Sequence, residues 1–149
     1  MIPDAININS VWDVLPPGIH DATMEEVKKS FATTIHRQLL FDKFKRGVES
    51  LRAAGCKTIY LDGSYVTTKT TPGDFDVCWD PTGVNGIELQ KKDPVLLDFS
   101  NKRQNQKRKY GGEFFPSSAK ADGTRTYLDY FQIDKNTGKA KGIIRILFS

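Results

Sequence analysis

The segment from residue 58 to residue 79 constrains the fold of this chain more than any other. An apolar strand is expected over Thr58–Leu61, the turn Gly63-Ser64 follows it, and a second strand is expected over Asp74–Trp79. Because successive side chains of a strand point to opposite faces, Asp74 and Asp76 should share one face while the residues between and after them are apolar and suit a core. The segment therefore predicts two carboxylates on one face of a strand whose opposite face packs into the protein core.

This arrangement of residues is suited to binding a metal–nucleotide complex. Mg²⁺, or Mn²⁺ in its place, binds carboxylate oxygens together with substrate phosphates and water, so Asp74 and Asp76 are the expected metal ligands. Gly63 permits close approach of a ligand, and free N–H groups would face a phosphate if Ser64 opens a helical turn. Lys69 is a candidate phosphate-binding cation in the same loop, although an exposed lysine in a Thr-rich turn fits equally well.

The order Gly-Ser, nine residues, Asp-x-Asp resembles the signature of the DNA polymerase beta-like nucleotidyltransferase superfamily. Residues 15–20, 110–116 and 141–144 are in addition similar to an uncharacterised group of short bacterial and phage nucleotidyltransferase-like proteins. The resemblance implies an enzyme that transfers a nucleoside monophosphate from ATP or another nucleoside triphosphate to an acceptor hydroxyl. Whether the acceptor belongs to a protein, an RNA or a small molecule stays open.

Members of that superfamily normally add a third carboxylate from a later strand, which completes a two-metal site. Glu113 lies on the first strand expected after a basic helix, which is the position that small members of the superfamily would use. Asp129 lies in an apolar segment that is expected to be a strand, where an unpaired charge would be costly. Both residues remain candidates for the catalytic carboxylate, and either one could instead face solvent. Asp62 is expected to cap or hydrogen-bond the turn rather than to bind metal.

One departure from the superfamily pattern supports a competing class of function. Many small nucleotidyltransferases carry an arginine two residues after the serine of the motif, and this chain carries Val66 there. The alternative is a catalytically inactive nucleotide- or RNA-binding module, or a toxin–antitoxin component, of the same fold.

Length and charge set further bounds. The 149 residues suffice for one domain, and no apolar run is long enough for a membrane span, so we expect a cytoplasmic protein that binds no membrane. The formal net charge is +4, and Lys102, Arg103 and Lys107 belong to a basic run. Such a run is either a solvated face or a binding site for an RNA acceptor. Lys135 and Lys141 belong to a second basic cluster near residue 140, which could balance a triphosphate.

The pattern of the whole chain predicts a mixed α/β (α+β) domain over residues 1–149, a β-sheet with helices packed against it. Thr23 begins a capping box, so a helix is expected to start there and to include Ile35. Further expected elements are an extended segment over residues 1–20, a helix over 40–51, a loop over 81–92, a helix over 94–109, and strands over 113–115, 126–133 and 142–148.

Overall fold

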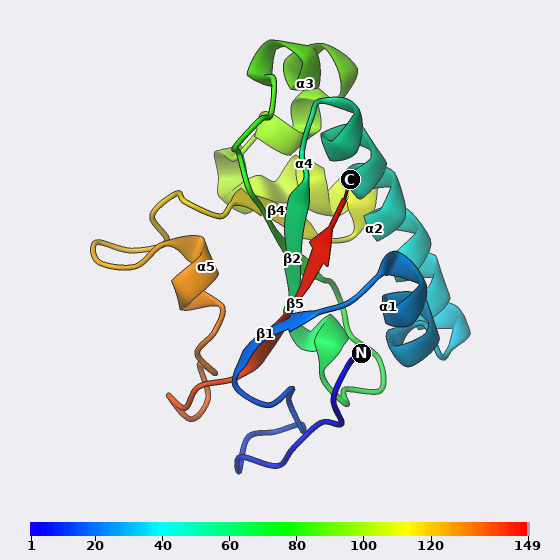
Figure 1. Cartoon of the computed structure of the whole chain (residues 1–149), viewed down its shortest axis with the longest axis vertical. Coiled ribbons are helices and arrows are strands. Elements are labelled where there is room, and N and C mark those ends of the chain that lie inside the picture. The colour runs from blue at the N-terminus through cyan, green and yellow to red at the C-terminus, as the bar shows by residue number, and fades with distance from the viewer. Residues whose placement is uncertain (149) are drawn as a thin grey trace.

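The computed structural model describes residues 1–148 as a mixed α/β domain built on one five-stranded sheet (Figure 1). The strands are β1 (Gly18–Asp21), β2 (Thr58–Asp62), β3 (Asp76–Trp79), β4 (Glu113–Pro116) and β5 (Gly142–Leu147). The α-helices are α1 (Met24–Phe31), α2 (Ile35–Ala53), α3 (Gly86–Lys92), α4 (Ser100–Tyr110) and α5 (Tyr127–Tyr130), and two 3-10 turns are η1 (Ser64–Val66) and η2 (Pro94–Leu97). The expected fold class is confirmed.

The sheet is mixed, with strand order β1-β5-β2-β3-β4. The central strand β2 runs antiparallel to β5 and to β3, while β1 pairs parallel with β5 and β3 pairs parallel with β4. Sequence-adjacent β2 and β3 therefore form a hairpin whose long connection carries the Gly63-Ser64 turn. This places the two halves of the motif at the same end of neighbouring strands.

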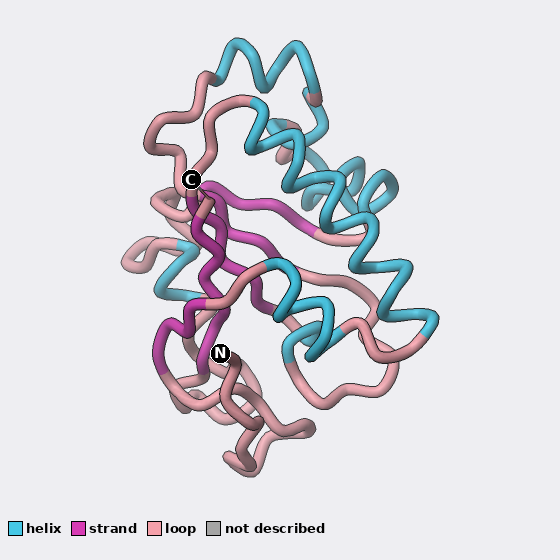
Figure 2. Tube along the Cα trace, turned by 45° about the vertical axis from the view of Figure 1, so that its right-hand side comes forward, coloured by secondary structure: helices cyan, strands magenta, loops and turns pink. Residues whose placement is uncertain are grey.

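The apolar face of the sheet is covered by α1 and α2, while α5 lies on the other side (Figures 1 and 2). Leu61, Val77 and Phe114 are in register on β2, β3 and β4, and all three are fully buried. Helix α2 approaches this face closely because residue 47 is glycine, and a Cβ there would come within 2.5 Å of the Phe114 ring. The other face of the same three strands is consequently free to carry polar side chains.

The N-terminal helices begin where side chains cap them. Thr23 forms the expected capping box, in which its hydroxyl accepts from the Glu26 N–H and the Glu26 carboxylate accepts from the Thr23 N–H. The expected continuation of this helix through Ile35 is wrong. Helix α1 ends at Phe31, and Thr34 caps a new helix that starts at Ile35, a residue that is 78% exposed.

Two later predictions are also wrong, and side-chain caps explain both. The segment 81–92, expected to be a loop, contains α3, whose first N–H groups are bound by Asn85. The segment 126–133, expected to be a strand, contains α5, whose Asp129 N–H is bound by the Thr126 hydroxyl. In the second segment, the capping oxygen of Thr126 thus outweighs the apolar composition that predicts a strand.

Smaller differences concern element boundaries. The helix expected over 94–109 is divided into η2 and α4, and it ends as expected at Gly111, which is left-handed with φ 73°. Strand β3 begins at Asp76 rather than at Asp74, and the extended N-terminal segment supplies β1 from Gly18. In the described part of the chain no helix is both long enough and apolar enough to cross a lipid bilayer.

Candidate functional site

Three carboxylates lie side by side on the polar face of the sheet. Asp62 on β2 is the register partner of Asp76 on β3, and Asp76 is the register partner of Glu113 on β4. Neighbouring strands are about 4.8 Å apart, so in-register side chains on one face are in close proximity. We call Asp62, Asp76 and Glu113 the carboxylate row. Like charges placed directly across strands destabilise a sheet, so this row needs a compensating cation or proton.

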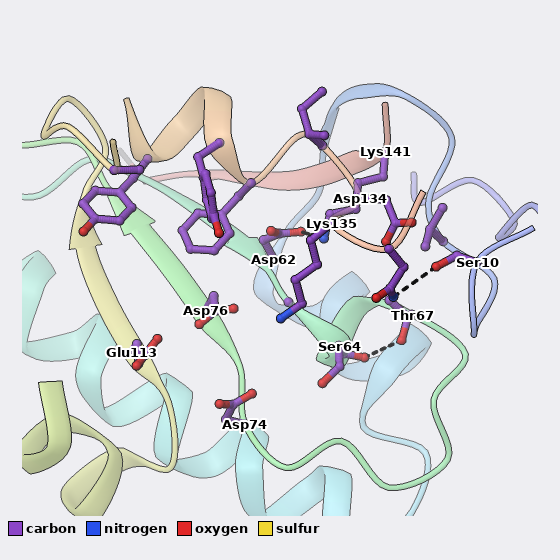
Figure 3. A pocket seen from close by; sticks show the side chains of 18 of the residues that line it. Ser10, Asp62, Ser64, Thr67, Asp74, Asp76, Glu113, Asp134, Lys135 and Lys141 are labelled. Atoms are coloured by element: carbon purple, nitrogen blue, oxygen red, sulfur yellow. Dashed lines mark hydrogen bonds and ion pairs between the residues drawn. The ribbon is translucent and has the colours of Figure 1, made fainter. Parts of the chain in front are cut away.

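Asp74 joins the row from the loop that precedes β3. Figure 3 shows its side chain near those of Asp76 and Glu113. Burial raises the pKa of Asp74, and the negative charge of Glu113 raises it further. The expected pair Asp74 and Asp76 therefore lies close together, although Asp74 belongs to the loop and not to the strand, and Glu113 is the third-carboxylate candidate that the structure brings to the pair.

Asp62 and Asp76 bind a proton more strongly than a carboxylate in water does. Burial, followed by repulsion from Asp62, Asp74 and Glu113, raises the pKa of Asp76 well above its ordinary value. Burial also raises the pKa of Asp62 to about 6, although Lys141 opposes this rise. Desolvation and like charges favour the neutral form in both cases.

Asp62 is the unexpected member of the row, since the sequence predicts a role for it in the turn and not beside the other carboxylates. The residue is only 1% exposed, and neither carboxylate oxygen has a hydrogen-bond partner. Its one ion pair is with Lys141, whose Nζ lies 3.4 Å from Oδ1. The hairpin register could have revealed this position, because a strand partner of Asp76 must share its face.

Glu113 is held by cations of the basic helix α4. Lys107 Nζ lies 2.9 Å and Arg103 Nε lies 3.7 Å from Glu113 Oε1. Lys107 and Arg103 therefore border the carboxylates, whereas the side chain of Lys102 is exposed and does not line the cleft described below. Of the three predicted acceptor-binding residues, two lie at the site.

Asp129 does not join the carboxylates. It is an exposed residue of the one-turn helix α5 and does not line the cleft. The expectation of a buried charge inside a strand came from the apolar neighbours Leu128 and Phe131. The helix instead directs those neighbours and Asp129 to different sides.

The Gly63-Ser64 turn lies against the row. Gly63 has φ 87°, a conformation that side chains disfavour, and a Cβ there would lie 2.8 Å from Asp76 Oδ2. Ser64 opens η1 as expected, although this turn spans only Ser64–Val66. A ligand bound by the turn would consequently contact the carboxylates as well.

A buried arginine orders the loop after the turn. Arg37 donates to the carbonyl oxygens of Tyr65 at 2.7 Å, Thr67 at 2.9 Å and Lys69 at 2.5 Å. The side chain of Lys69 lines the cleft, with its Nζ 4.5 Å from the centre of the Trp12 ring. Lys69 is thus near the site, held over an aromatic ring.

Lys135 is a further cation that the motif did not indicate. Figure 3 shows its side chain extending between Asp76 and Ser64, and its charge opposes the rise in the pKa of Asp74. It follows Asp134, which is anchored by accepting from the N–H and the hydroxyl of Thr137. In the sequence Lys135 belongs to a basic cluster, and only the folded chain places it beside the carboxylates.

These groups surround one cleft of about 910 Å³, a volume suited to a small-molecule ligand. Its charged lining side chains are Asp62, Lys69, Asp74, Asp76, Arg103, Lys107, Glu113, Arg125, Asp134, Lys135 and Lys141. Among residues 1–148, no three His, Cys, Asp or Glu side chains are grouped closely enough to hold an ion by themselves. The burial of Asp62, which is compensated by an ion pair with Lys141, and the repulsion along the row nevertheless fit a divalent cation that takes its remaining ligands from phosphate and water.

The family-level comparison covers nearly the whole chain. The model of a family of unknown function, DUF6932, matches residues 6–147, so the chain belongs to that family. No curated protein matches the chain. No solved structure matches it either.

Proposed function

We propose that this chain is a metal-dependent nucleotidyltransferase that moves a nucleoside monophosphate from a nucleoside triphosphate to an acceptor hydroxyl. The observation that carries the proposal is the carboxylate row, which crosses three strands in register and contacts the Gly63-Ser64 turn. Carboxylates beside a phosphate-binding turn are the parts that phosphoryl and nucleotidyl transfer require. The resemblance of the same residues to the nucleotidyltransferase signature supports the same activity.

The residues divide into two groups by their roles. Asp74 and Asp76, with Glu113, would hold Mg²⁺ or Mn²⁺, which supplies charge neutralisation at the phosphates and activates the attacking hydroxyl. The N–H groups at Ser64 would bind the terminal phosphates, assisted by the cations Lys69 and Lys135. Most of the rate enhancement would come from positioning and from electrostatic stabilisation.

The reaction is a substitution at the α-phosphorus. The acceptor oxygen forms a bond to the α-phosphorus, the bond from that atom to the bridging oxygen breaks, and pyrophosphate leaves with the electron pair. The proton of the acceptor hydroxyl passes to a carboxylate of the row. The products are the nucleotidylated acceptor and pyrophosphate.

The first test is calorimetric titration of the protein with each of the four nucleoside triphosphates. We expect binding in Mg²⁺ that is lost in EDTA and reduced at least about tenfold in Asp74→Asn/Asp76→Asn, because a charge-assisted contact contributes roughly 1.5–3 kcal/mol. Asp80→Asn is the matched control, since Asp80 follows the same strand but lies outside the cleft. Equal affinity in EDTA, or a double variant that binds like the wild type, would refute the metal site.

A second candidate, a nucleotide-binding module without turnover, is favoured by the ion pairs of Glu113 with Lys107 and Arg103. A carboxylate engaged by two cations is less available to a metal ion. Incubation with α-labelled triphosphate, Mg²⁺ and either total tRNA or total protein separates the candidates. Transfer of label to an acceptor supports the enzyme, whereas saturable binding without transfer supports the module.

A further inference from the structure

A cluster of aromatic rings forms one wall of the cleft and has no part in the chemistry described above. We call Phe115, Tyr127, Tyr130 and Phe131 the aromatic wall; all four line the cleft. Ring centroids are 4.3 Å apart for Phe115 and Tyr127, and 5.2 Å apart for Phe115 and Phe131. The rings of Tyr127 and Phe131 are stacked with only 22° between their planes. One pair of rings is therefore nearly parallel, whereas Tyr130 stands edge-on to Phe131 with 81° between their planes.

The wall is joined rigidly to the carboxylate row. Phe115 follows Glu113 by two residues on β4 and shares its face, at a separation of about 6.6 Å along the strand. Helix α5 is attached to the end of this strand through hydrogen bonds from Tyr127 N–H to Ala119 O at 2.9 Å and from Leu128 N–H to Ser117 O at 3.3 Å. A ligand that touches the carboxylates can reach the wall within the length of one sugar ring.

Two arginines accompany the rings. The guanidinium of Arg103 lies 4.5 Å from the centre of the Phe115 ring, and that of Arg125 lies 5.3 Å from the centre of the Tyr130 ring. Phe115 is buried, whereas Tyr127 and Phe131 are partly exposed and Tyr130 is 37% exposed. A purely structural cluster would bury these rings more completely. Aromatic faces interleaved with cations are the surface on which nucleic acid bases stack.

We propose that the aromatic wall is the subsite for the nucleobase of the triphosphate, and that it favours purines. The proposal rests on the proposed function, because the phosphates must lie at the Gly63-Ser64 turn for the base to reach α5. A nucleotide is polyanionic at one end and planar and aromatic at the other, which matches the two ends of this cleft. Purines present the larger stacking surface and should bind more tightly than pyrimidines.

The experiment compares two probes, a nucleoside triphosphate and inorganic tripolyphosphate, each titrated in Mg²⁺ by calorimetry. Tripolyphosphate retains the phosphate contacts but has no base. We expect ATP and GTP to bind more tightly than tripolyphosphate, and Tyr127→Ala and Phe131→Leu to weaken only the nucleotides. The loss for Tyr127→Ala should be roughly 5- to 150-fold, equivalent to about 1–3 kcal/mol.

Unchanged affinity for tripolyphosphate in each variant shows that the rest of the cleft is folded. Phe99→Leu is the matched control, because Phe99 is a partly exposed aromatic residue outside the cleft. If nucleotides bind no more tightly than tripolyphosphate, or if both wall variants bind ATP like the wild type, the base subsite is refuted while the phosphate site stands. If neither probe binds in Mg²⁺, the proposed function fails and the base subsite fails with it.

Discussion

At the scale of single residues, Asp62 occupies an unfavourable environment in the site. Its side chain is buried, its oxygens have no hydrogen-bond partner, and it stands opposite Asp76. A buried charge without full compensation costs folding free energy, and Lys141 compensates Asp62 through one ion pair at 3.4 Å. A buried carboxylate such as Asp62 is retained where its charge serves binding, which is consistent with a row that attracts cations.

The raised pKa of Asp62, about 6, makes the free energy of unfolding depend on pH. Because the folded form binds the proton more strongly than the unfolded form, the Asp62 carboxyl stabilises the fold as pH falls through 6 towards 4, and this stabilisation is lost as pH rises. Asp62→Asn should therefore remove about 1.4 kcal/mol of the pH dependence between pH 7.5 and pH 5, because one pH unit below the raised pKa corresponds to about 1.4 kcal/mol. Urea unfolding at pH 7.5 and at pH 5, without divalent cations, measures the change.

The control for this experiment is Asp80→Asn, which changes a carboxylate at the far end of β3. It should leave the pH dependence as in the wild type. If the stabilities of Asp62→Asn and the wild type change in parallel between the two pH values, Asp62 is ionised throughout and its inferred environment is wrong.

At the scale of elements, α2 and the loop after β2 act as one unit. Arg37, 5% exposed on the first turn of α2, donates to the carbonyl oxygens of Tyr65, Thr67 and Lys69, and Tyr65 Oη donates back to the Arg37 carbonyl at 2.9 Å. A loop of this length would otherwise leave buried carbonyl groups unpaired. The loop that follows the Gly63-Ser64 turn is thus held in place by a helix on the other side of the sheet.

Replacing this arginine should loosen the loop and weaken phosphate binding together. We expect Arg37→Met to lower the free energy of unfolding by at least about 2 kcal/mol, because one buried and two partly buried carbonyl groups lose their donor. Tripolyphosphate affinity in Mg²⁺ should fall in the same variant. Urea unfolding and calorimetry provide the two measurements.

Arg46→Met is the comparison, since Arg46 is an exposed residue of the same helix. It should change neither quantity measurably. An Arg37→Met protein that is destabilised but binds tripolyphosphate normally would show that the hydrogen bonds of Arg37 contribute to stability alone.

At the scale of the whole molecule, the cleft collects charges from segments far apart in the chain. Asp62 and Lys69 come from the first hairpin, Lys107 from α4, and Lys135 and Lys141 from the last connection before β5. No local pattern relates these positions. Their assembly produces a cleft lined by charges of both signs, which is the basis of the metal and triphosphate sites that we propose.

Lys135 and Lys139 allow this assembly to be tested with a matched pair. Lys135 extends into the cleft, whereas Lys139 donates outside it to the carbonyl oxygen of Ile8 at 3.2 Å. We expect Lys135→Ala to weaken tripolyphosphate binding roughly tenfold and to reduce its salt dependence, since a charge-assisted contact contributes about 1.5–3 kcal/mol. Lys139→Ala should behave like the wild type. Equal losses in both variants would indicate a general effect of net charge.

The sequence by itself determined the features that depend on near neighbours. The capping box at Thr23, the helix end at Gly111, the strand over residues 58–61 and the turn at Ser64 all follow from contacts within a few residues. The proximity of Asp74 to Asp76 follows likewise from their separation by one residue, although Asp74 lies in the loop before β3 and not on the strand that the alternating pattern predicts. These features were enough to predict a mixed α/β fold and two of the carboxylates that line the candidate site.

Only the tertiary structure decided which distant residues complete that site. The choice of Glu113 rather than Asp129 depends on the pairing of β4 with β3, and the position of Asp62 depends on the hairpin register. The aromatic wall exists because Thr126 caps a helix where the apolar pattern indicated a strand. Register and packing arise from the free energy of the whole fold, so contacts distant in the chain could not be inferred from local pattern.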